Sequence, residues 1–301
     1  MYLDHFKFNQ MPFGLTPNTG FFCNLKGHEE AIQVLLFSLH SGEGFIKIVG
    51  EVGAGKTLIC RKLLDHLQEN FTTAYIPTPD LNPMELRRAF ARELGIDLTG
   101  ITDQHDLLTR IYHRLVELHM QNKRVVLLID EAQALSLESL EAIRLLTNFE
   151  TEKTKLFQVV LFGQPELDIL LANPQLRQLE QRITFSYYLP LLNREDLDTY
   201  LFHRLAVAGV SSGTLFAKKS RDLLYKASRG VPRLINVICH KALLIAYGRG
   251  EYKVTRKTMR SAILDTELIL RSNKKTLVIF ALILSTLIGF VLYYYRIKGI
   301  I

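Results

Sequence analysis

An eight-residue stretch in the first quarter of the chain limits its possible folds more than any other feature. The stretch fits the pattern G-x-x-x-x-G-K-[ST] of a phosphate-binding loop, whose backbone N–H groups turn inward around an anion at a helix N-terminus. That geometry needs a strand before the loop and a helix after it, and the sequence supplies both, as Phe45–Val49 and Leu58–Leu67. Lys56 is therefore predicted to reach the β- and γ-phosphates of a nucleotide, and the Thr57 hydroxyl to ligate Mg²⁺. The loop consists of Gly50, Glu51, Val52, Gly53, Ala54, Gly55, Lys56 and Thr57.

An acidic pair, Asp130-Glu131, follows the continuously apolar run Val125–Ile129, which is typical of a strand covered on both faces. Carboxylates that leave such a strand lie at the carboxyl edge of a parallel sheet, beside the phosphates. Asp130 is predicted to hold Mg²⁺ through water, and Glu131 to activate the attacking water as a general base. Because two adjacent carboxylates repel each other, the pair itself favours a bound cation. ATP and Mg²⁺ are thus the expected cofactors.

The order of the predicted elements indicates an α/β fold followed by an all-α domain. Strands alternate with helices over residues 45–190, which predicts a P-loop NTPase core with a parallel, doubly wound sheet of five strands. Residues 1–44 form a lead-in of loop material and one helix, and residues 191–270 are predicted to be an α-helical lid. The expected strands are Phe45–Val49, Thr73–Ile76, Val125–Ile129, Phe157–Phe162 and Thr184–Leu189. The expected lid helices are Arg194–Ala208, Ala217–Ser228, Pro232–Tyr247 and Arg256–Leu270.

The net charge of +7 is distributed unevenly along the chain. Residues 1–189 carry 18 Lys+Arg and 23 Asp+Glu, whereas residues 190–275 carry 17 Lys+Arg and only 7 Asp+Glu. Such a basic block suits an anionic lipid surface, a nucleic acid or an acidic partner, and it is equally compatible with a solvated basic face. The three cysteines, Cys23, Cys60 and Cys239, show neither metal-ligand spacing nor a disulfide framework, which indicates reduced thiols.

The C-terminal end carries a second constraint, because residues 276–295 contain no charged side chain. As a helix this segment would span about 30 Å, the thickness of a bilayer core. Basic residues flank it on both sides, and Tyr293, Tyr294 and Tyr295 cluster where an interfacial aromatic belt would lie. The pattern predicts a single transmembrane helix followed by a short tail, residues 296–301. The N-terminal residues do not form a secretory signal. The need for ATP and the pattern of reduced cysteines lead us to expect the nucleotide-binding part in the cytosol.

Several further stretches give the chain a family resemblance. GEVGAGKT, LLIDEAQAL, LLTNFE, VVLFGQPEL, LEQRI and GVPRLIN, together with PFGLTP near the N-terminus, resemble the secretion-type AAA+ ATPases of the general secretion pathway protein A (ExeA) family. The resemblance covers roughly residues 1–270. Secretion members of the family continue into a periplasmic peptidoglycan-binding domain, whereas six residues follow Tyr295 here. This difference favours the shorter type represented by MshM, of mannose-sensitive haemagglutinin (MSHA) pilus biogenesis.

The resemblance also implies roles for residues by their position. Gln164, after the fourth predicted strand, is expected to be sensor 1, aligned on the γ-phosphate or the attacking water. Arg182 is expected to be the arginine finger that reaches the nucleotide of a neighbouring subunit, with Arg177 as the competing candidate. Arg233, at the start of a lid helix, is expected to be sensor 2. Pro12 and Phe13 are expected to cover the adenine ring.

Three functions are compatible with these features. The leading interpretation is a membrane-anchored AAA+ ATPase that assists assembly of a cell-envelope machine, a type IV (MSHA-like) pilus or a type II secretion system. It would be an ATP-linked homo-oligomer, with a ring as one arrangement, in the bacterial inner membrane, single-pass, with the ATPase domain in the cytoplasm. Its partners would be inner-membrane pilus or secretion proteins, with anionic lipid as a further candidate and nucleic acid disfavoured.

The two alternatives use the same core differently. A DNA-acting AAA+ ATPase, of the transposition-regulator or origin-recognition type, is supported by the basic block over residues 190–275. The apolar C-terminal segment and the lack of a recognition-helix signature after the lid oppose it. The other alternative is a nucleotide-dependent scaffold with slow turnover. Glu131 opposes a site that binds ATP without hydrolysing it.

Overall fold

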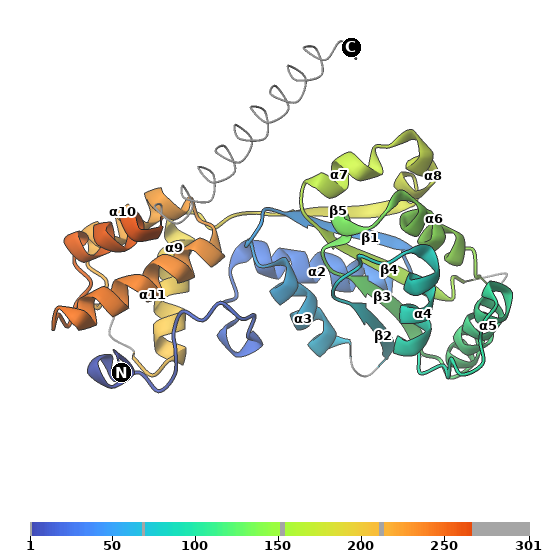
Figure 1. Ribbon diagram of the computed structural model, residues 1–301, viewed down its shortest axis with the longest axis horizontal. Coiled ribbons are helices and arrows are strands. Elements are labelled where there is room, and N and C mark those ends of the chain that lie inside the picture. Colours follow the sequence, from blue (N-terminus) through green and yellow to red (C-terminus); the bar gives the residue numbers. More distant parts are fainter. Residues whose placement is uncertain (1, 68–69, 151–153, 211–213, 267–301) are drawn as a thin grey trace, which may run out of the picture.

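A parallel five-stranded sheet forms the centre of the larger domain (Figure 1). The computed structural model describes residues 2–67, 70–150, 154–210 and 214–266. The strands lie in the order β2-β3-β4-β1-β5, and every neighbouring pair is parallel. They are β1 (Phe45–Gly50), β2 (Phe71–Ile76), β3 (Arg124–Ile129), β4 (Phe157–Gly163) and β5 (Ile183–Leu189). The predicted α/β fold with five parallel strands is confirmed.

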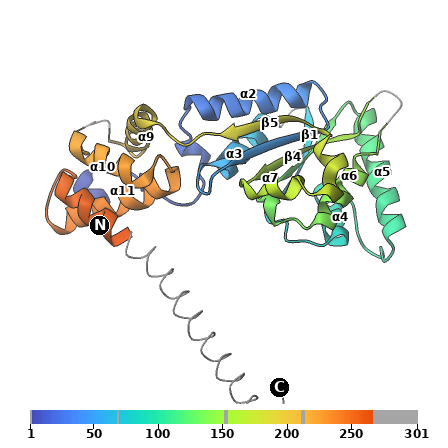
Figure 2. The ribbon, with the colours of Figure 1, turned by 90° about the horizontal axis from the view of Figure 1, so that it is seen from above.

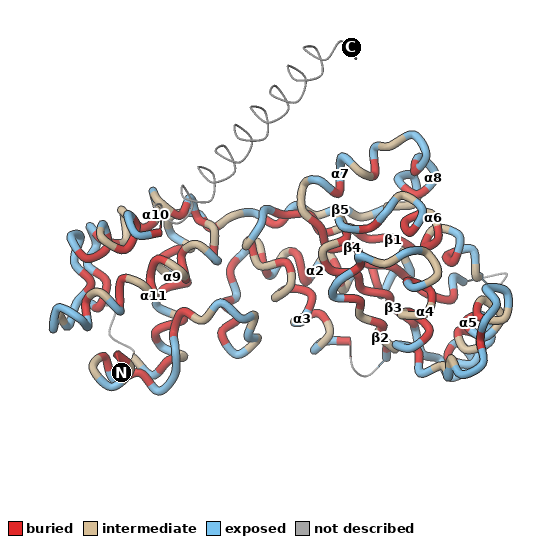
Figure 3. The backbone as a smooth tube through the Cα atoms, viewed as in Figure 1, coloured by how far each residue is buried: buried red, intermediate tan, exposed pale blue. Residues whose placement is uncertain are grey.

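Helices cover both faces of this sheet, because its central strands are apolar on both faces. Along β3, Val126 and Leu128 belong to the core formed with α2 and α3, whereas Val125 and Leu127 belong to the core formed with α4, α5 and α6. Figure 2 separates the two helical layers, and Figure 3 shows the strands between them as mainly buried chain. The covering helices are α2 (Lys26–His40), α3 (Lys56–His66), α4 (Pro83–Glu93), α5 (Gln104–Met120), α6 (Leu137–Leu146) and α7 (Glu166–Leu171).

The order of the strands decides which loops meet at the carboxyl edge of the sheet. Because β4 lies between β1 and β3, the residue that follows β4 lies between the phosphate-binding loop after β1 and the acidic pair after β3. Three short helical segments complete this domain: η2 (Ala132–Ala134), η3 (Pro174–Leu176) and α8 (Arg177–Glu180). The sequence pattern predicted neither these nor α7, because elements of three to six residues show too little periodicity.

A smaller helical domain follows Pro190. It contains α9 (Arg194–Val207), α10 (Lys218–Ser228), α11 (Pro232–Gly248) and a further helical stretch over residues 256–266. Asn193 fixes the start of α9, since its side chain accepts from the backbone N–H of Asp196 and the Asp196 carboxylate accepts from the backbone N–H of Asn193. Such a reciprocal cap stabilises a helix by about 1 kcal/mol.

The N-terminal residues belong to this helical domain and not to a separate lead-in. Helix α1 (Tyr2–Phe6) and the segment η1 (Thr19–Phe21) contribute Tyr2, Phe6 and Phe21 to the same buried cluster as α9 and α11. The chain then crosses to the larger domain at α2 and returns at Pro190. The two crossings touch, because a Cβ on Gly27 would lie 2.5 Å from Pro190. Only glycine leaves room for this contact.

The predicted transmembrane helix and inner-membrane localisation need correction. Within the residues that the structure describes, no helix is both long enough and apolar enough to cross a bilayer. The segment 276–295, on which the prediction depended, lies outside the described residues, as does the tail 296–301. The prediction rested on the sequence pattern of that segment and its flanks, and no described element supports it.

Candidate nucleotide-binding site

The phosphate-binding loop has the backbone shape that its glycines predict. It connects β1 to α3, with Gly53 at φ 78° and Gly55 at φ 110°, both in the left-handed region that glycine adopts without strain. The loop forms one wall of a cavity of about 280 Å³. The opposite walls come from residues 14–18, which we call the strap, and from the helical domain. The cavity-lining residues outside the loop and strap are Leu58, Glu131, Tyr200, Arg204, Pro232, Arg233 and Asn236.

Lys56 lies buried at the base of the loop, with 5% of its surface exposed. Its Nζ donates to the carbonyl oxygens of Gly50, at 2.7 Å, and Glu51, at 3.1 Å. Burial lowers the pKa of the ammonium, and the carboxylates of Glu131 and Asp130 oppose that shift. Among the described residues, the ammonium has only neutral carbonyls within hydrogen-bond distance, which nucleotide phosphates can replace as stronger acceptors.

Asp130 and Thr57 meet where a cation would bridge to those phosphates. The Asp130 carboxylate is 2% exposed, accepts from the backbone N–H of Glu131 at 2.9 Å, and is hydrogen-bonded by the Thr57 hydroxyl. Burial raises its pKa, which the two hydrogen bonds oppose. A buried carboxylate beside a hydroxyl suits a hard cation such as Mg²⁺. The described residues contain no cluster of three or more His, Cys, Asp or Glu side chains, so water and phosphate oxygens would complete the coordination.

Glu131 is held by two glutamines. Its Oε2 accepts from Gln133 Nε2 at 2.6 Å and from Gln164 Nε2 at 2.8 Å, and the backbone N–H of Gln164 donates to Gln133 Oε1 at 3.0 Å. Glu131 itself has φ 52°, and non-glycine residues held at such angles cluster at functional sites. The carboxylate is therefore fixed beside the loop, as a general base requires. The sequence motifs predicted Gln164 but not Gln133, for which the only signal was its place two residues after the acidic pair.

Arg233 and the N-terminal Pro12-Phe13 pair differ in how close they lie to the cavity. Arg233 lines it from the first turn of α11, and its backbone N–H donates to the carbonyl of Gly53 at 3.2 Å. A Cβ on Gly53 would lie 2.7 Å from Arg233 Cβ, so the helical domain packs directly on the loop. Phe13 is instead buried against Phe216, with ring centroids 5.9 Å apart, and neither it nor Pro12 lines the cavity.

The two arginine-finger candidates lie at the opposite edge of the sheet from their own loop. Arg182 precedes β5, whose first residue pairs with Phe45, whereas the loop begins at the other end of β1, about 17 Å away. The Arg182 guanidinium donates to Thr147 Oγ1 at 3.0 Å and to Asn148 Oδ1 at 2.8 Å. Arg177 is exposed, and its side chain forms no hydrogen bond or ion pair with the described residues. Neither side chain can act on the nucleotide of its own subunit.

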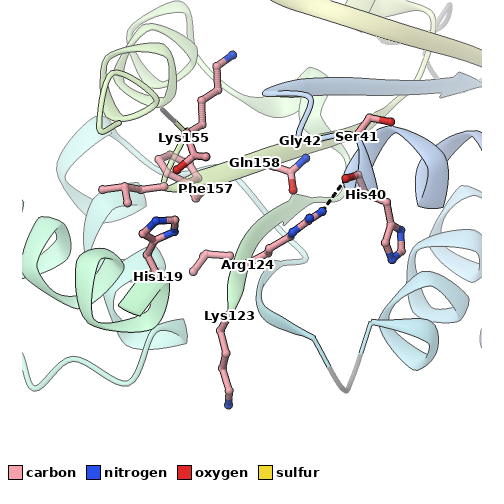
Figure 4. A pocket seen from close by; sticks show the side chains of 12 residues that line it. His40, Ser41, Gly42, His119, Lys123, Arg124, Lys155, Phe157 and Gln158 are labelled. Atoms are coloured by element: carbon pink, nitrogen blue, oxygen red, sulfur yellow. Dashed lines mark hydrogen bonds between the residues drawn. The ribbon is translucent and has the colours of Figure 1, made fainter. Parts of the chain in front are cut away.

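A second cavity, of about 430 Å³, lies at that same edge of the sheet, away from the phosphate-binding loop (Figure 4). Its described lining includes His119, Lys123, Arg124 and Lys155, and no acidic residue among the residues that the structure describes. Arg124 donates to the carbonyls of Leu39 and His40 at the end of α2. Helix C-termini gather at this edge of a parallel sheet and attract cations. Its basic residues are explained by the ends of the helices and do not require a nucleotide.

His28 lies beneath the phosphate-binding loop, and its titratable imidazole is buried. It is 5% exposed, and a Cβ on Gly55 would lie 3.5 Å from its Nε2. Among the described residues this Nε2 has no hydrogen-bond partner. Burial lowers the pKa of the imidazole below its usual value of 6.5. The folded protein therefore favours the neutral ring.

We expect stability to fall as the pH drops below about 6.5. Above that pH, His28 is neutral in the folded and the unfolded chain. Below it, His28 of the unfolded chain binds a proton more readily than His28 of the folded chain. The stabilisation is present above the unfolded pKa and is lost as the pH falls toward the lower folded pKa. Thermal unfolding between pH 7.5 and 5 would show this fall in Tm, and His28→Gln should flatten it. The exposed His40→Gln is the control, and an equal slope in all three proteins would contradict the prediction.

Comparison with known proteins agrees with this geometry. Residues 39–171 match the family described as "AAA domain". The fold is similar to Cdc6p from Pyrobaculum aerophilum, at a TM-score of 0.63 and 19% identity, covering 86% of this chain and 70% of that one. It is also similar to the RuvB Holliday junction branch migration motor of Thermotoga maritima, at 0.54 and 16%, covering 80% and 69%. At these identities the likeness concerns the fold alone. Fold and site together define an AAA-type P-loop ATPase.

Sequence identity to a known protein places the chain in one family within this class of ATPases. The chain is 41% identical over 254 residues to general secretion pathway protein A of Aeromonas hydrophila. The match covers 84% of this chain but 46% of that protein, so the chain spans about half the length of this relative. The chain belongs to the general secretion pathway protein A (ExeA) family of AAA ATPases, as the sequence motifs implied.

Proposed function

We propose that this chain hydrolyses ATP, with Mg²⁺, to assist assembly of a cell-envelope machine, a type II secretion system or an MSHA-like type IV pilus. One observation carries the hydrolytic part: Glu131, beside the phosphate-binding loop, is held by Gln133 and Gln164. A site that only bound ATP would not need a fixed carboxylate there. Membership of the general secretion pathway protein A family supports the secretion part.

Within this proposal each site residue has one role. Lys56 and the loop N–H groups bind the phosphates, Thr57 and Asp130 bind Mg²⁺, and Glu131 activates water. Gln164 acts as sensor 1 and Arg233 as sensor 2. The strap, residues 14–18, contacts the base or sugar, because it lines the cavity where Pro12 and Phe13 do not. Those two residues anchor the strap to the helical domain.

The cellular test compares wild type with Glu131→Gln in cells that lack the chromosomal copy. Surface pili and secreted proteins would be measured, with protein level checked by immunoblot. We expect wild type to restore one of the two and Glu131→Gln to restore neither. Full restoration by a variant shown in vitro to have no turnover would exclude hydrolysis from the function and favour the slow scaffold.

We also propose that the active form is an oligomer in which Arg182 of one subunit completes the site of the next. Thr147 and Asn148 hold its guanidinium at a fixed position, which suits an electrostatic role. Arg182→Ala should lower ATP turnover by about 10³-fold and leave ATP affinity nearly unchanged. Mixing it with Lys56→Ala should restore part of the activity, because an intact site forms between the two variants. Phosphate release and light scattering with and without ATP would measure both effects.

Arg177→Ala is the matched control for this prediction, since Arg177 lies near Arg182 in sequence but no described residue holds its side chain. We expect close to wild-type turnover from it. A larger defect in Arg177→Ala, together with no recovery in the mixture that contains Arg182→Ala, would transfer the role to Arg177.

A DNA-acting ATPase is a second candidate, favoured by the end of the helical domain. There Lys253, Arg256 and Lys257 are exposed and form no ion pair with the described residues, and Tyr252, 73% exposed, stacks on His5 at 4.4 Å. DNA binding that is tight and falls steeply with salt would support this candidate. Weak binding at 0.15 M salt would leave the envelope function as the better account.

A further inference from the structure

A buried arginine stands beside the nucleotide cavity without an acidic partner. Arg204, on α9, is 6% exposed and forms no ion pair with the described residues. Three aromatic rings surround its guanidinium, whose central carbon lies 4.7 Å from the ring centroid of Phe21, 5.5 Å from Tyr200 and 6.0 Å from Phe13. Rings compensate a buried cation only in part, and such charges are usually paired. The arrangement therefore leaves Arg204 with unused capacity to donate hydrogen bonds.

Arg204 also connects the strap to the helical domain. Its Nε donates to the carbonyl of Pro12 at 2.5 Å, and its Nη1 donates to the Tyr200 hydroxyl at 3.0 Å. That hydroxyl donates to Asn236 Oδ1 at 2.9 Å, and Asn236 Nδ2 donates to the carbonyl of Gly14 at 3.4 Å. One network from α9 and α11 thus holds the backbone on both sides of Phe13. The second Nη of Arg204 has no hydrogen bond to the described residues.

Arg204 lies at the end of the nucleotide cavity that is away from the phosphate-binding loop. Arg204 lines the nucleotide cavity together with the strap, and it also lines a neighbouring cavity of about 480 Å³. The neighbouring cavity shares four strap residues with the first but none of the phosphate-binding loop. Arg204 therefore lies where the strap meets the helical domain, away from the loop. A nucleotide held at the loop by its phosphates would extend its sugar and base toward this end.

We propose that Arg204 recognises the nucleoside half of the bound ATP, by donating to an acceptor on the sugar or base while it holds the strap in place. The inference rests on the proposed function and adds to it a residue that sets nucleoside affinity. Phosphate binding is left to Lys56 and the loop. Tyr200 and Asn236 are positioning residues that act through Arg204 and the strap.

The test compares three ligands in the full chain: MgATP, MgADP and inorganic tripolyphosphate, which has the phosphates but no nucleoside. Arg204→Met should weaken ATP and ADP binding about tenfold or more, and change tripolyphosphate binding less than about twofold. KM for ATP should rise while kcat at saturation stays nearly constant. Tyr200→Phe should show the same pattern with a smaller loss, and Arg204→Lys should recover part of the affinity. Arg249→Met, at an exposed arginine that follows the C-terminal end of α11, is the control and should change nothing.

Two results would overturn the inference: normal ATP affinity in a folded Arg204→Met, or an equal loss for ATP and tripolyphosphate. If Arg204→Met does not fold, Arg204→Lys and Tyr200→Phe decide by the same comparison. A wild-type chain that binds tripolyphosphate as tightly as ATP would also contradict the inference. A wild-type chain that binds none of the three would instead contradict the proposed function.

Discussion

Glu131→Gln is expected to bind ATP normally and to lose its turnover by about 10²- to 10⁴-fold, the usual contribution of a general base. The glutamine side chain keeps the size and polarity of the glutamate but cannot accept a proton from the attacking water. Binding should survive because Lys56, Thr57 and the loop N–H groups are unchanged. Titration with a fluorescent ATP analogue and a phosphate-release assay measure the two quantities separately.

Glu138→Gln is the matched control, since Glu138 is an exposed glutamate seven residues further along the chain. It should keep wild-type turnover. Gln133→Ala should fall between the two, because it removes one of the two donors that fix the Glu131 carboxylate. Normal hydrolysis in Glu131→Gln would exclude this residue as the base.

Lys56→Ala is expected to weaken ATP binding by about 100-fold or more. The variant removes a cation that would donate to the phosphates, and a charged hydrogen bond of this kind contributes about 1.5–3 kcal/mol. The loop N–H groups would remain to bind the phosphates. ATP affinity would be measured by calorimetry at fixed Mg²⁺, with thermal unfolding to establish that the variant is folded.

Lys62→Ala, on the same helix, controls for the loss of a lysine from α3. Its ammonium lies 5.7 Å from the Phe22 ring centroid and lines no part of the nucleotide cavity, so ATP affinity should stay unchanged. If Lys56→Ala bound ATP as tightly as Lys62→Ala, the phosphates would be held by the backbone alone.

The phosphate end of the site could be predicted from sequence because its residues are close along the chain or end adjacent strands. A loop of eight residues fixes its own backbone through glycine, and the pair Asp130-Glu131 follows a strand whose apolar pattern is unmistakable. Strand alternation then predicts the parallel sheet, and the sheet brings loop, acidic pair and Gln164 to one edge.

The nucleoside end could not be predicted in the same way. Arg204 and the strap are separated by almost two hundred residues, and Arg204 lies in a helix with several other charged residues, so the sequence does not single it out. Phe13 was expected at the base because of the family resemblance, but the apolar core of the helical domain buries it. Periodicity describes elements one at a time and contains no information about which of them meet.

The contact between Gly27 and Pro190 has a mechanical consequence. A domain joined to another by two adjacent chain segments can rotate about one axis but resists sliding and twisting. Pro190 directly follows β5, a strand of seven residues, and Arg182 directly precedes it. The axis of rotation and the residue proposed to face the next subunit therefore lie at the two ends of one strand. A turn of the helical domain about this contact would act on one end of β5, and the surface proposed to meet a neighbouring subunit lies at the other end.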